Sequence, residues 1–221
     1  MLRIIAGDLR RRQIDTPRGN ERTRPLPDRV RTSVFNMLAG HFEDEVYFDA
    51  FAGTGSFGFE AISRGARECV FVEKDRGVMR LLKGNAEKLG IEDRCTFFHG
   101  DALGAGAAAM CPEGVHVIFF DPPYPLMQDP QTRARVFEQF ERVCERLDPE
   151  GFALLRTPWP LRDRDEDSDP EHPTFTEVAL GFASLVGPET HTYGTTAVHW
   201  FGRVPSSASA DEAPGDDAAG A

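Results

Sequence analysis

Residues 48–60 read FDAFAGTGSFGFE, a glycine-rich turn that follows an apolar run and precedes a segment with helical spacing. Gly53, Gly55 and Gly58 fit the pattern G-x-G-x-x-G, in which the backbone passes close to a ligand at the start of a helix. The residues that lead into it, VYFDAFA, are typical of a buried strand. The stretch therefore predicts a strand, a turn and a helix that together hold a nucleotide-like cofactor.

Strand-like and helix-like segments alternate on from this turn. The strand-like runs are ECVFVEKD, CTFFHGD, VHVIFFD and GFALLRT, and the strongest helical patterns between them are RGVMRLLKGNAEKLG and QTRARVFEQFERVCERL. Continuously apolar strands that alternate with helices predict a parallel sheet covered on both faces. The expected fold is α/β and Rossmann-like, with a mostly parallel seven-stranded sheet and helices on both faces.

The segment after Thr157 breaks this alternation. PWPLRDRDEDSDPEHP is predicted to be a polar loop, because it is too acidic to pack. TFTEVALGFASLV and THTYGTTAVHWFGR are predicted to be two further strands that form an antiparallel C-terminal pair. The end of the chain from residue 204 is small, polar and acidic, so we expect an acidic, disordered tail over 204–221.

The first forty residues resemble a separate small unit. LRIIAG and RRQIDT are predicted to form a hairpin, and Asp28 is predicted to cap a helix with apolar residues at helical spacing. The segment holds nine arginines and four acids, whereas the whole chain has a formal net charge of −11. A local basic excess of this kind favours a phosphate-bearing partner. We therefore divide the chain into a basic extension at 1–44 that can face phosphates, a main α/β domain at 45–203 and the tail at 204–221.

Composition excludes several classes of protein. The chain has 221 residues with 40% hydrophobic content, and no apolar run approaches the 18 or so residues of a membrane span. Its four cysteines are scattered without a CxxC pair, and its six histidines show no metal-ligand spacing. We expect a cytoplasmic monomer with reduced thiols, no metal and no membrane contact.

Acidic residues end three of the predicted strands. Glu73 lies twenty residues after Gly53 and can accept hydrogen bonds from the two hydroxyls of a ribose. Asp101 ends the next strand, where an acid can meet an adenine amino group. Asp49, four residues before the first glycine, can face a positively charged ligand but would sit awkwardly beside a pyrophosphate. S-adenosylmethionine fits this pattern, because it has a ribose, an ammonium group and a sulfonium and has no phosphate. A loop-capping role for Asp49 is the structural alternative.

The stretch FFDPPYP at 119–125 closes the fourth predicted strand with poor strand chemistry. Asp121 and the carbonyl of Pro122 could accept the two N–H bonds of an exocyclic amino group and orient its nitrogen. Pro123 adds stiffness, and Tyr124 could stack on a base taken out of its helix. The structural alternative is a rigid turn that leaves the sheet.

With the turn at 48–60 and DPPY at 121–124, the chain resembles the class I methyltransferases that modify exocyclic amino groups. It resembles most closely the RsmD-type family, which methylates a guanine N2 of bacterial small-subunit (16S) ribosomal RNA. The stretches that carry this resemblance are RIIAG, RPLPDRVRTSVFNML, FDAFAGTGSFGFEAISRGA, VEKD, DPPY and YGTTAV, and they span the chain from about Leu2 to Arg203.

The resemblance implies a SAM-dependent rRNA (guanine-N2)-methyltransferase and a set of site residues. The catalytic residues would be Asp121, Pro122, Pro123 and Tyr124. The residues that bind S-adenosylmethionine would be Asp49, Phe51, Gly53, Gly55, Glu73, Lys74, Asp101 and Ala102. The residues that contact rRNA would be Arg10, Arg11, Arg12, Arg24, Arg29 and Arg31. The chain departs from the family at Arg10–Arg12, where the family usually shows a glycine, and at Pro27.

Four other functions stay open at this point. The DPPY type of motif also serves adenine-N6 methylation of DNA and methylation of protein glutamine. An NAD-dependent oxidoreductase shares the glycines and the ribose acid, although Asp49 and DPPY disfavour it. A catalytically silent RNA-binding or assembly protein would have no need of an intact DPPY.

Overall fold

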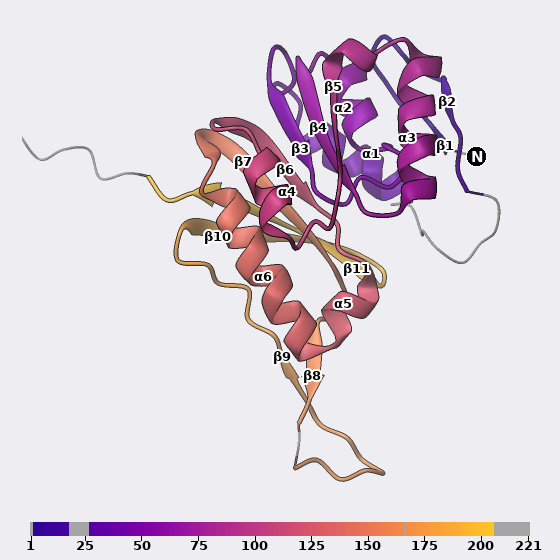
Figure 1. The fold of residues 1–221 in the computed structure, drawn as a ribbon. Coiled ribbons are helices and arrows are strands. Elements are labelled where there is room, and N and C mark those ends of the chain that lie inside the picture. The colour runs from indigo at the N-terminus through magenta and orange to yellow at the C-terminus, as the bar shows by residue number, and fades with distance from the viewer. Residues whose placement is uncertain (1, 18–26, 166, 206–221) are drawn as a thin grey trace, which may run out of the picture.

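The computed structural model describes residues 2–17, 27–165 and 167–205. Within this part of the chain, a seven-stranded sheet has the order β10-β11-β7-β6-β3-β4-β5 (Figure 1). The parallel strands are β3 (Val46–Asp49), β4 (Glu68–Glu73), β5 (Cys95–His99), β6 (Val115–Phe120) and β7 (Leu147–Pro158). An antiparallel pair, β10 (Leu185–Tyr193) and β11 (Thr196–Arg203), extends the sheet beyond β7. The predicted α/β fold with a mostly parallel seven-stranded sheet is confirmed.

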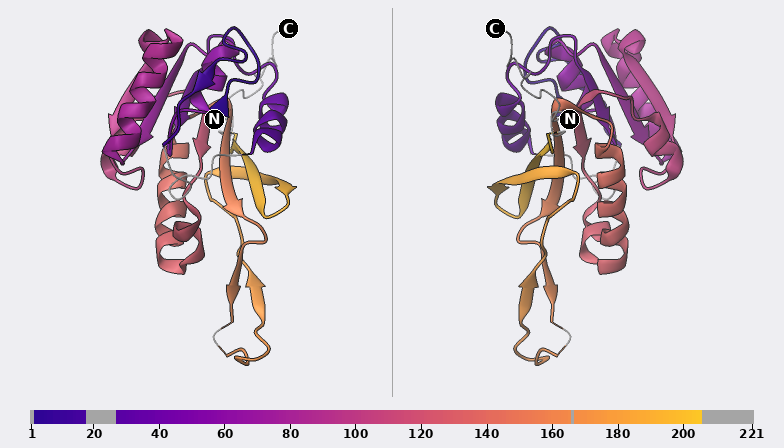
Figure 2. Two further views of the ribbon diagram at one scale, coloured as in Figure 1. Left: turned by 90° about the vertical axis from the view of Figure 1, so that its right-hand side faces the viewer. Right: turned by 90° about the vertical axis from the view of Figure 1, so that its left-hand side faces the viewer.

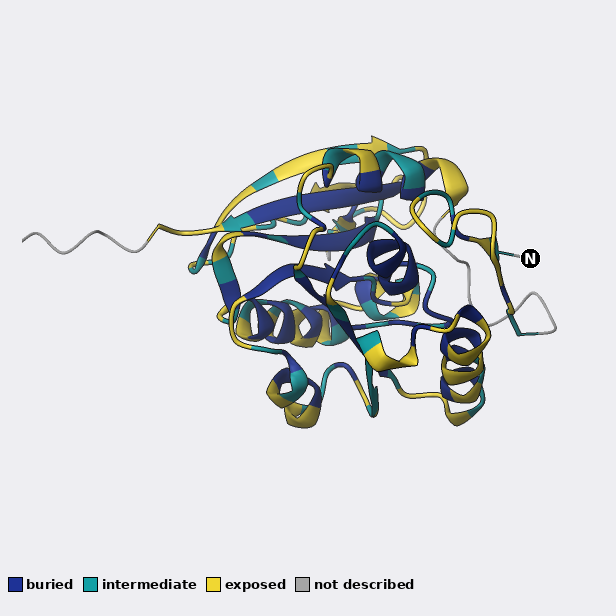
Figure 3. Cartoon of the chain, turned by 90° about the horizontal axis from the view of Figure 1, so that it is seen from above, coloured by how far each residue is buried: buried dark blue, intermediate teal, exposed yellow. Residues whose placement is uncertain are grey.

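Helices cover both faces of the sheet, and Figure 3 shows their buried sides facing it. One core cluster holds α1 (Asp28–Met37), α2 (Gly58–Ser63) and α3 (Arg76–Leu89) against one face. The other holds α4 (Ala105–Met110), α5 (Tyr124–Gln128) and α6 (Pro130–Cys144) against the opposite face. Alternate residues of a strand supply the two clusters, as Phe119 and Phe120 of β6 do. A 3₁₀ turn (Glu92–Arg94) precedes β5.

Local chemistry explains where the two long helices begin and end. The carboxylate of Asp75 accepts hydrogen bonds from the first turn of α3, and Gly90 ends that helix in the left-handed conformation at φ 72°. Asp129 caps α6, whose first residue is Pro130. The predicted cap by Asp28 is wrong, because Pro27 precedes α1 and no side chain caps the helix.

The N-terminal hairpin, β1 (Leu2–Arg3) with β2 (Gln13–Ile14), contacts α2 through the turn between its strands. The backbone N–H groups of Ile5 and Ala6 donate to the carboxylate of Glu60, which is fully buried, at 2.7 and 3.0 Å. Ile4 and Ile14 belong to the same core cluster as α1, α2 and α3. The hairpin is therefore anchored to the main sheet through α2, while the proposed division at residue 44 stays a prediction.

The segment after β7 differs from the prediction. Instead of a plain loop, β8 (Arg162–Arg164) and β9 (Phe175–Glu177) form a separate hairpin that projects from the body (Figure 2). The predicted strand TFTEVALGFASLV is wrong in its bounds, since only its start pairs with β8. The antiparallel pair lies later, because Gly194 at φ 64° makes the turn between β10 and β11.

The predictions of an acidic tail and of no membrane span also concern residues that the structure does not describe. The acidic tail predicted from residue 204 lies almost entirely outside the described residues, which end at 205. Among the helices that are described, none is both long enough and apolar enough to cross a membrane.

Candidate active site

The carboxyl ends of β3 and β6 meet at the point where the chain changes sheet faces. The connection after β3 passes through α2 on one face, and the connection after β6 passes through α5 and α6 on the other. Asp49 pairs in register with Phe119, and the N–H of Ala50 donates to the carbonyl of Phe119 at 3.0 Å. Open α/β sheets bind their ligands in the crevice at such a switch point.

The glycine-rich turn after β3 is built as its sequence predicts. Gly53 and Gly55 adopt φ of 55° and 90°, a region that residues with a side chain rarely adopt. A Cβ on Gly58 would lie 2.2 Å from the ring of Phe71 on β4, so only glycine allows α2 to approach the sheet this closely.

Asp49 at the end of β3 is a buried carboxylate with an incomplete set of partners. Its side chain is 1% exposed. Oδ2 accepts a long hydrogen bond, 3.4 Å, from the N–H of Gly58, and Oδ1 has no partner among the described residues. Burial, together with the negative charges of Asp121 and Glu73, raises the pKa of Asp49 to about 8. A buried oxygen without a partner is costly, so this carboxylate is fitted to a cationic or N–H donor ligand.

Glu73 at the end of β4 holds the turn in place. Oε2 accepts from the N–H of Gly53 at 3.0 Å, and Oε1 accepts from the N–H of Asp75 at 2.7 Å. Burial raises its pKa, while these N–H groups lower it. Each oxygen keeps a lone pair, so the carboxylate can still accept a hydrogen bond from a ligand hydroxyl.

The other predicted cofactor residues lie along the same edge of the sheet or beside it. Asp101, past the end of β5, is exposed and accepts from the N–H of Leu103 at 3.0 Å. Ala102 is buried, and its carbonyl accepts from Gln139 on α6 at 2.9 Å. Phe51 packs edge-on against Phe120, with 5.0 Å between ring centroids. Lys74 follows Glu73 and is exposed. The fold thus brings the predicted cofactor residues to the carboxyl ends of β3, β4 and β5.

Asp121, directly after β6, forms an ion pair that the sequence analysis missed. Phe120 is the register partner of Leu155, so the next residues on β6 and β7, Asp121 and Arg156, come side by side. The Nε–H of Arg156 donates to Oδ1 of Asp121. Burial raises the pKa of Asp121, and the guanidinium of Arg156 lowers it. Within the described residues, no other group donates to this carboxylate.

Arg156 also contacts the last residue of the DPPY motif. Its guanidinium carbon lies over the ring of Tyr124, 5.2 Å from the centroid. The carbonyl of Pro122 accepts no hydrogen bond from the described residues, and Pro123 precedes α5, which Tyr124 begins. One signal in the sequence could have found Arg156, since it is the one charged residue in the apolar run FALLRT and charged residues are rarely buried without a partner.

The predicted RNA-contacting arginines fall into two groups. Arg10, Arg11, Arg12 and Arg29 are exposed, and Arg24 lies outside the described residues. Arg10 and Arg11 help to line a surface hollow of about 350 Å³ between the hairpin and α1, together with Arg3, Ile4, Ile5, Asp28 and Thr32. Arg3 was not among the predicted residues, although it belongs to the same basic cluster.

Arg31 does not belong to this surface. Its side chain is 1% exposed, and its Nη2 donates to the carbonyl of Arg3 at 2.6 Å and to Asp28 at 3.0 Å. Its Nε and Nη1 are buried without partners among the described residues, and burial lowers its pKa. The predicted contact of Arg31 with RNA is therefore not available in this conformation, because the side chain ties α1 to the hairpin.

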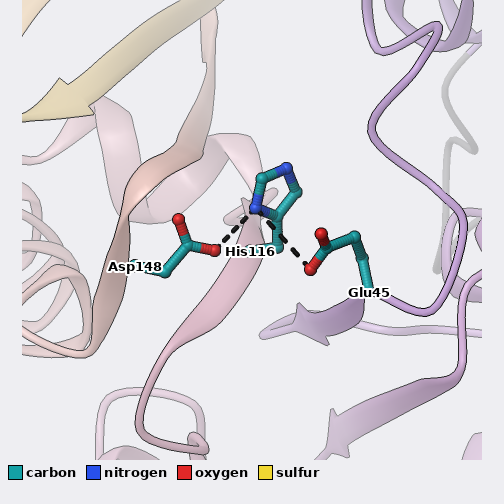
Figure 4. A group of neighbouring side chains, drawn as sticks. All are labelled: Glu45, His116 and Asp148. Carbon is teal, nitrogen blue, oxygen red and sulfur yellow. Dashed lines mark hydrogen bonds and ion pairs between the residues drawn. The ribbon is translucent and has the colours of Figure 1, made fainter.

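A second polar cluster lies at the opposite, amino-terminal edge of the sheet (Figure 4). Nδ1 of His116, at the start of β6, lies 2.6 Å from Asp148 and 3.7 Å from Glu45. Nε2 of His116 lies 2.9 Å from Nδ1 of His41. The three residues Glu45, His116 and Asp148 could hold a metal ion geometrically, but both nitrogens of His116 already have hydrogen-bond partners. His41, His116 and Asp148 form a hydrogen-bonded chain that joins the connection before β3 to β6 and β7.

Comparison with known proteins adds a family and several relatives. The family "Conserved hypothetical protein 95" matches residues 2–157. YlbH of Bacillus subtilis is 30% identical over 198 residues, covering 89% of this chain and 96% of YlbH. Ribosomal RNA small subunit methyltransferase D of Haemophilus influenzae is 29% identical over 172 residues, covering 70% of this chain and 86% of that protein. The Escherichia coli K12 protein of the same name is 35% identical over 128 residues, covering 56% and 60%.

Solved structures share the fold. The yhhF protein of Escherichia coli has a TM-score of 0.68 at 26% identity, covering 91% of this chain and 97% of that one. An RNA methyltransferase from Salinibacter ruber, solved with S-adenosyl-L-homocysteine, has a TM-score of 0.52 at 17% identity and covers 82% and 97%. At that identity the second likeness concerns the fold alone.

Proposed function

Because the chain belongs to the family "Conserved hypothetical protein 95" and is an RsmD-type methyltransferase, we propose that it methylates the N2 amino group of a guanine in small-subunit ribosomal RNA. The general reaction, SAM-dependent methylation of rRNA, agrees with the names of the chain's relatives. The choice of guanine N2 rests on the DPPY motif and on the family resemblance. One observation carries the proposal: two carboxylates, the buried Asp49 and the partly buried Asp121, lie at the switch point of the sheet, close enough for their charges to interact.

S-adenosylmethionine supplies a methyl group on a sulfonium, whose sulfur leaves as a neutral thioether when the methyl is transferred. The chain's residues fit this cofactor, because Asp49 offers a buried oxygen that has no partner among the described residues, where a cationic ligand group can bind. Glu73 would accept from the ribose hydroxyls, and Asp101 would meet the adenine amino group. The turn at Gly53 and Gly55 would lie under the amino acid part. Phe51, Lys74 and Ala102 would complete the surroundings.

The target base would be held by DPPY. Oδ2 of Asp121 and the carbonyl of Pro122 would accept the two N–H bonds of the guanine amino group, since neither has a hydrogen-bond partner in the described structure. This aims the nitrogen along the line of the breaking bond and favours the positive charge that develops on it. Tyr124 would stack on the flipped base, an interaction of roughly 1–3 kcal/mol.

The exposed arginines at the N-terminal hairpin and α1 would contact rRNA phosphates. Arg10, Arg11, Arg12 and Arg29 supply charge without base recognition. The hollow beside Arg10 and Arg11 offers these contacts a concave surface. Arg31 would act indirectly, by holding α1 against the hairpin.

The test is transfer of labelled methyl from S-adenosylmethionine to small ribosomal subunits from cells that lack this gene. Digestion to nucleosides identifies the product. We expect N2-methylguanosine with the wild-type protein and none with Asp121→Ala, while SAM binding by that variant stays nearly intact.

Other results would point to the alternatives. Label in DNA adenine or in a protein amide would mean that the protein is a methyltransferase with a substrate other than rRNA. Binding of subunits without any transfer, although SAM binds, would favour the silent RNA-binding protein. A failure to bind SAM would favour the alternative of an NAD-dependent oxidoreductase.

A further inference from the structure

The two contacts of Arg156 join the catalytic motif at both ends. On one side Arg156 donates to Oδ1 of Asp121, and on the other its guanidinium lies over the ring of Tyr124 at 5.2 Å. The side chains of Arg156 and Asp121 are 9% and 16% exposed, so the pair is largely shielded from solvent. A charge-assisted bond in such surroundings is strong and fixes geometry.

We propose that Arg156 is a positioning residue for methyl transfer, which keeps Asp121 an ionised acceptor with one oxygen free and orients the ring of Tyr124 for the target base. This inference rests on the proposed function and deepens it. It assigns a role to a residue of β7 that lies outside the DPPY motif.

The first part of the role follows from the single bond to Asp121. Arg156 occupies Oδ1, so Oδ2 is the oxygen that remains for an amino N–H of the substrate. A protonated carboxyl would carry a hydrogen in its place and could not accept in the same way. The charged groups that interact with Asp121 are Arg156 on β7 and Asp49 on β3, and Asp49 interacts in turn with Glu73. Arg156 is the only cation among them in the described structure.

The second part follows from the position of the guanidinium on the tyrosine ring. A cation over an aromatic face is attracted to it and restricts the orientation of the ring. Since Arg156 covers one face of Tyr124, a flipped base would stack on the other. Arg156, Tyr124 and the base would then form a three-layer stack next to the acceptor oxygens.

The test compares Arg156→Gln, which removes the charge, with Arg156→Lys, which keeps it. At pH 7 we expect Arg156→Gln to lower kcat on the order of 10- to 100-fold, the size of effect that a misplaced reacting group produces. The affinity for SAM should stay within about twofold. The acidic limb of the pH–kcat profile should move to higher pH by about 1 unit or more, because the carboxylate has lost its cation. Arg156→Lys should restore most of that position of the limb.

A matched control is Arg142→Gln on α6, since Arg142 is an exposed arginine paired with Glu138. It should leave the pH profile unchanged. If the limb of Arg156→Gln coincides with that of the wild type, the positioning role is wrong, even if kcat is lower.

A second measurement needs neither a variant of Arg156 nor the rRNA substrate. In wild-type protein with isotope-labelled aspartate and arginine, the signals of the Asp121 carboxyl carbon and of the Arg156 Nε–H should both change with pH at one midpoint, that of Asp121. The Asp121 signal is assigned by its loss in Asp121→Asn. Different midpoints would overturn the pair. Equal midpoints in a protein that does not methylate subunits would instead overturn the proposed substrate and keep the pairing.

Discussion

Asp49, which is buried, and Asp121, which is partly buried, lie at the carboxyl ends of the neighbouring parallel strands β3 and β6, close enough for their charges to interact. Burial is the main reason that the pKa of Asp49 is raised to about 8, and the charge of Asp121 is the second. Two acids held this close disfavour full ionisation unless a cation joins them. Arg156 supplies one positive charge beside Asp121. Asp49 has no such cation beside it among the described residues, and the positively charged cofactor of a methyltransferase could supply one.

Asp49→Asn should therefore change how stability depends on pH. The carboxyl binds a proton in the folded protein up to about pH 8, whereas its ordinary pKa of 3.8 applies when unfolded. Between these values the folded state holds more protons, so the free energy of unfolding falls as pH rises, by at most ~1.4 kcal/mol per pH unit. Asn removes this loss. Thermal melts without cofactor at pH 5 to 8 should show Asp49→Asn gaining on the wild type as pH rises.

A difference in melting temperature that stays constant over this range would contradict the raised pKa. The same variant should bind SAM more weakly, on the order of 10-fold or more, because a charge-assisted bond is replaced by a neutral one.

Asp121→Asn should lose activity without losing the cofactor. The amide keeps the shape of the side chain but cannot carry the charge that favours the developing cation, so kcat should fall on the order of 10²- to 10³-fold. Isothermal titration should give nearly the wild-type affinity for SAM. Asp93→Asn is the control, because Asp93 is exposed in the turn before β5. Equal losses of transfer and of SAM binding would place Asp121 in the cofactor site instead.

Much of the fold was predictable because each strand and helix carries its own pattern. Apolar runs such as VHVIFF and ECVFVE became β6 and β4, and Gly90 ended α3 as expected. The hairpin of β8 and β9 was not predictable in this way. It is short and acidic and packs on little of the core, so no apolar periodicity marks it. The predicted bounds of β10 were wrong because the prediction treats THTYGTTAVHWFGR as one strand, whereas the turn at Gly194 divides it between β10 and β11.

The site was predictable where it depends on position along one strand. Asp49, Glu73 and Asp121 were located because carboxyl ends of parallel strands share an edge. Arg156 and the chain from His41 through His116 to Asp148 depend on which strands are neighbours and on register, which local sequence does not contain. Arg31 is the converse case, since its place in a basic stretch concealed that its side chain is buried and bonded to the hairpin.

Arg29 and Arg31 give a paired prediction, because they are two positions apart on α1 but differ in burial. Arg29→Ala should weaken rRNA binding and reduce the slope of log affinity against log salt by about 1, with an unchanged melting temperature. Arg31→Ala should lower the free energy of unfolding by about 2 kcal/mol, since it removes charge-assisted hydrogen bonds to Arg3 and Asp28. Filter binding over a salt series and chemical denaturation measure the two effects.

The opposite result for Arg31→Ala would mean that Arg31 contacts RNA. If Arg31→Ala is as stable as the wild type and lowers the salt slope, then the buried conformation of this side chain is not the one that binds RNA.

His116→Phe should destabilise the protein without affecting the active site. The ring keeps its volume, but the hydrogen bonds of both nitrogens, to Asp148 at 2.6 Å and to His41 at 2.9 Å, are lost. Leaving these partners unsatisfied should cost about 1–3 kcal/mol in the free energy of unfolding. His172→Phe is the matched control, because His172 is 84% exposed in the projecting hairpin. SAM affinity should be unchanged in both variants, since His116 lies at the amino end of β6 and Asp121 follows its carboxyl end.

An unchanged free energy of unfolding for His116→Phe would mean that the cluster contributes no net stability. A chelator that lowers the melting temperature of the wild type but not of His116→Phe would mean that Glu45, His116 and Asp148 hold a metal ion.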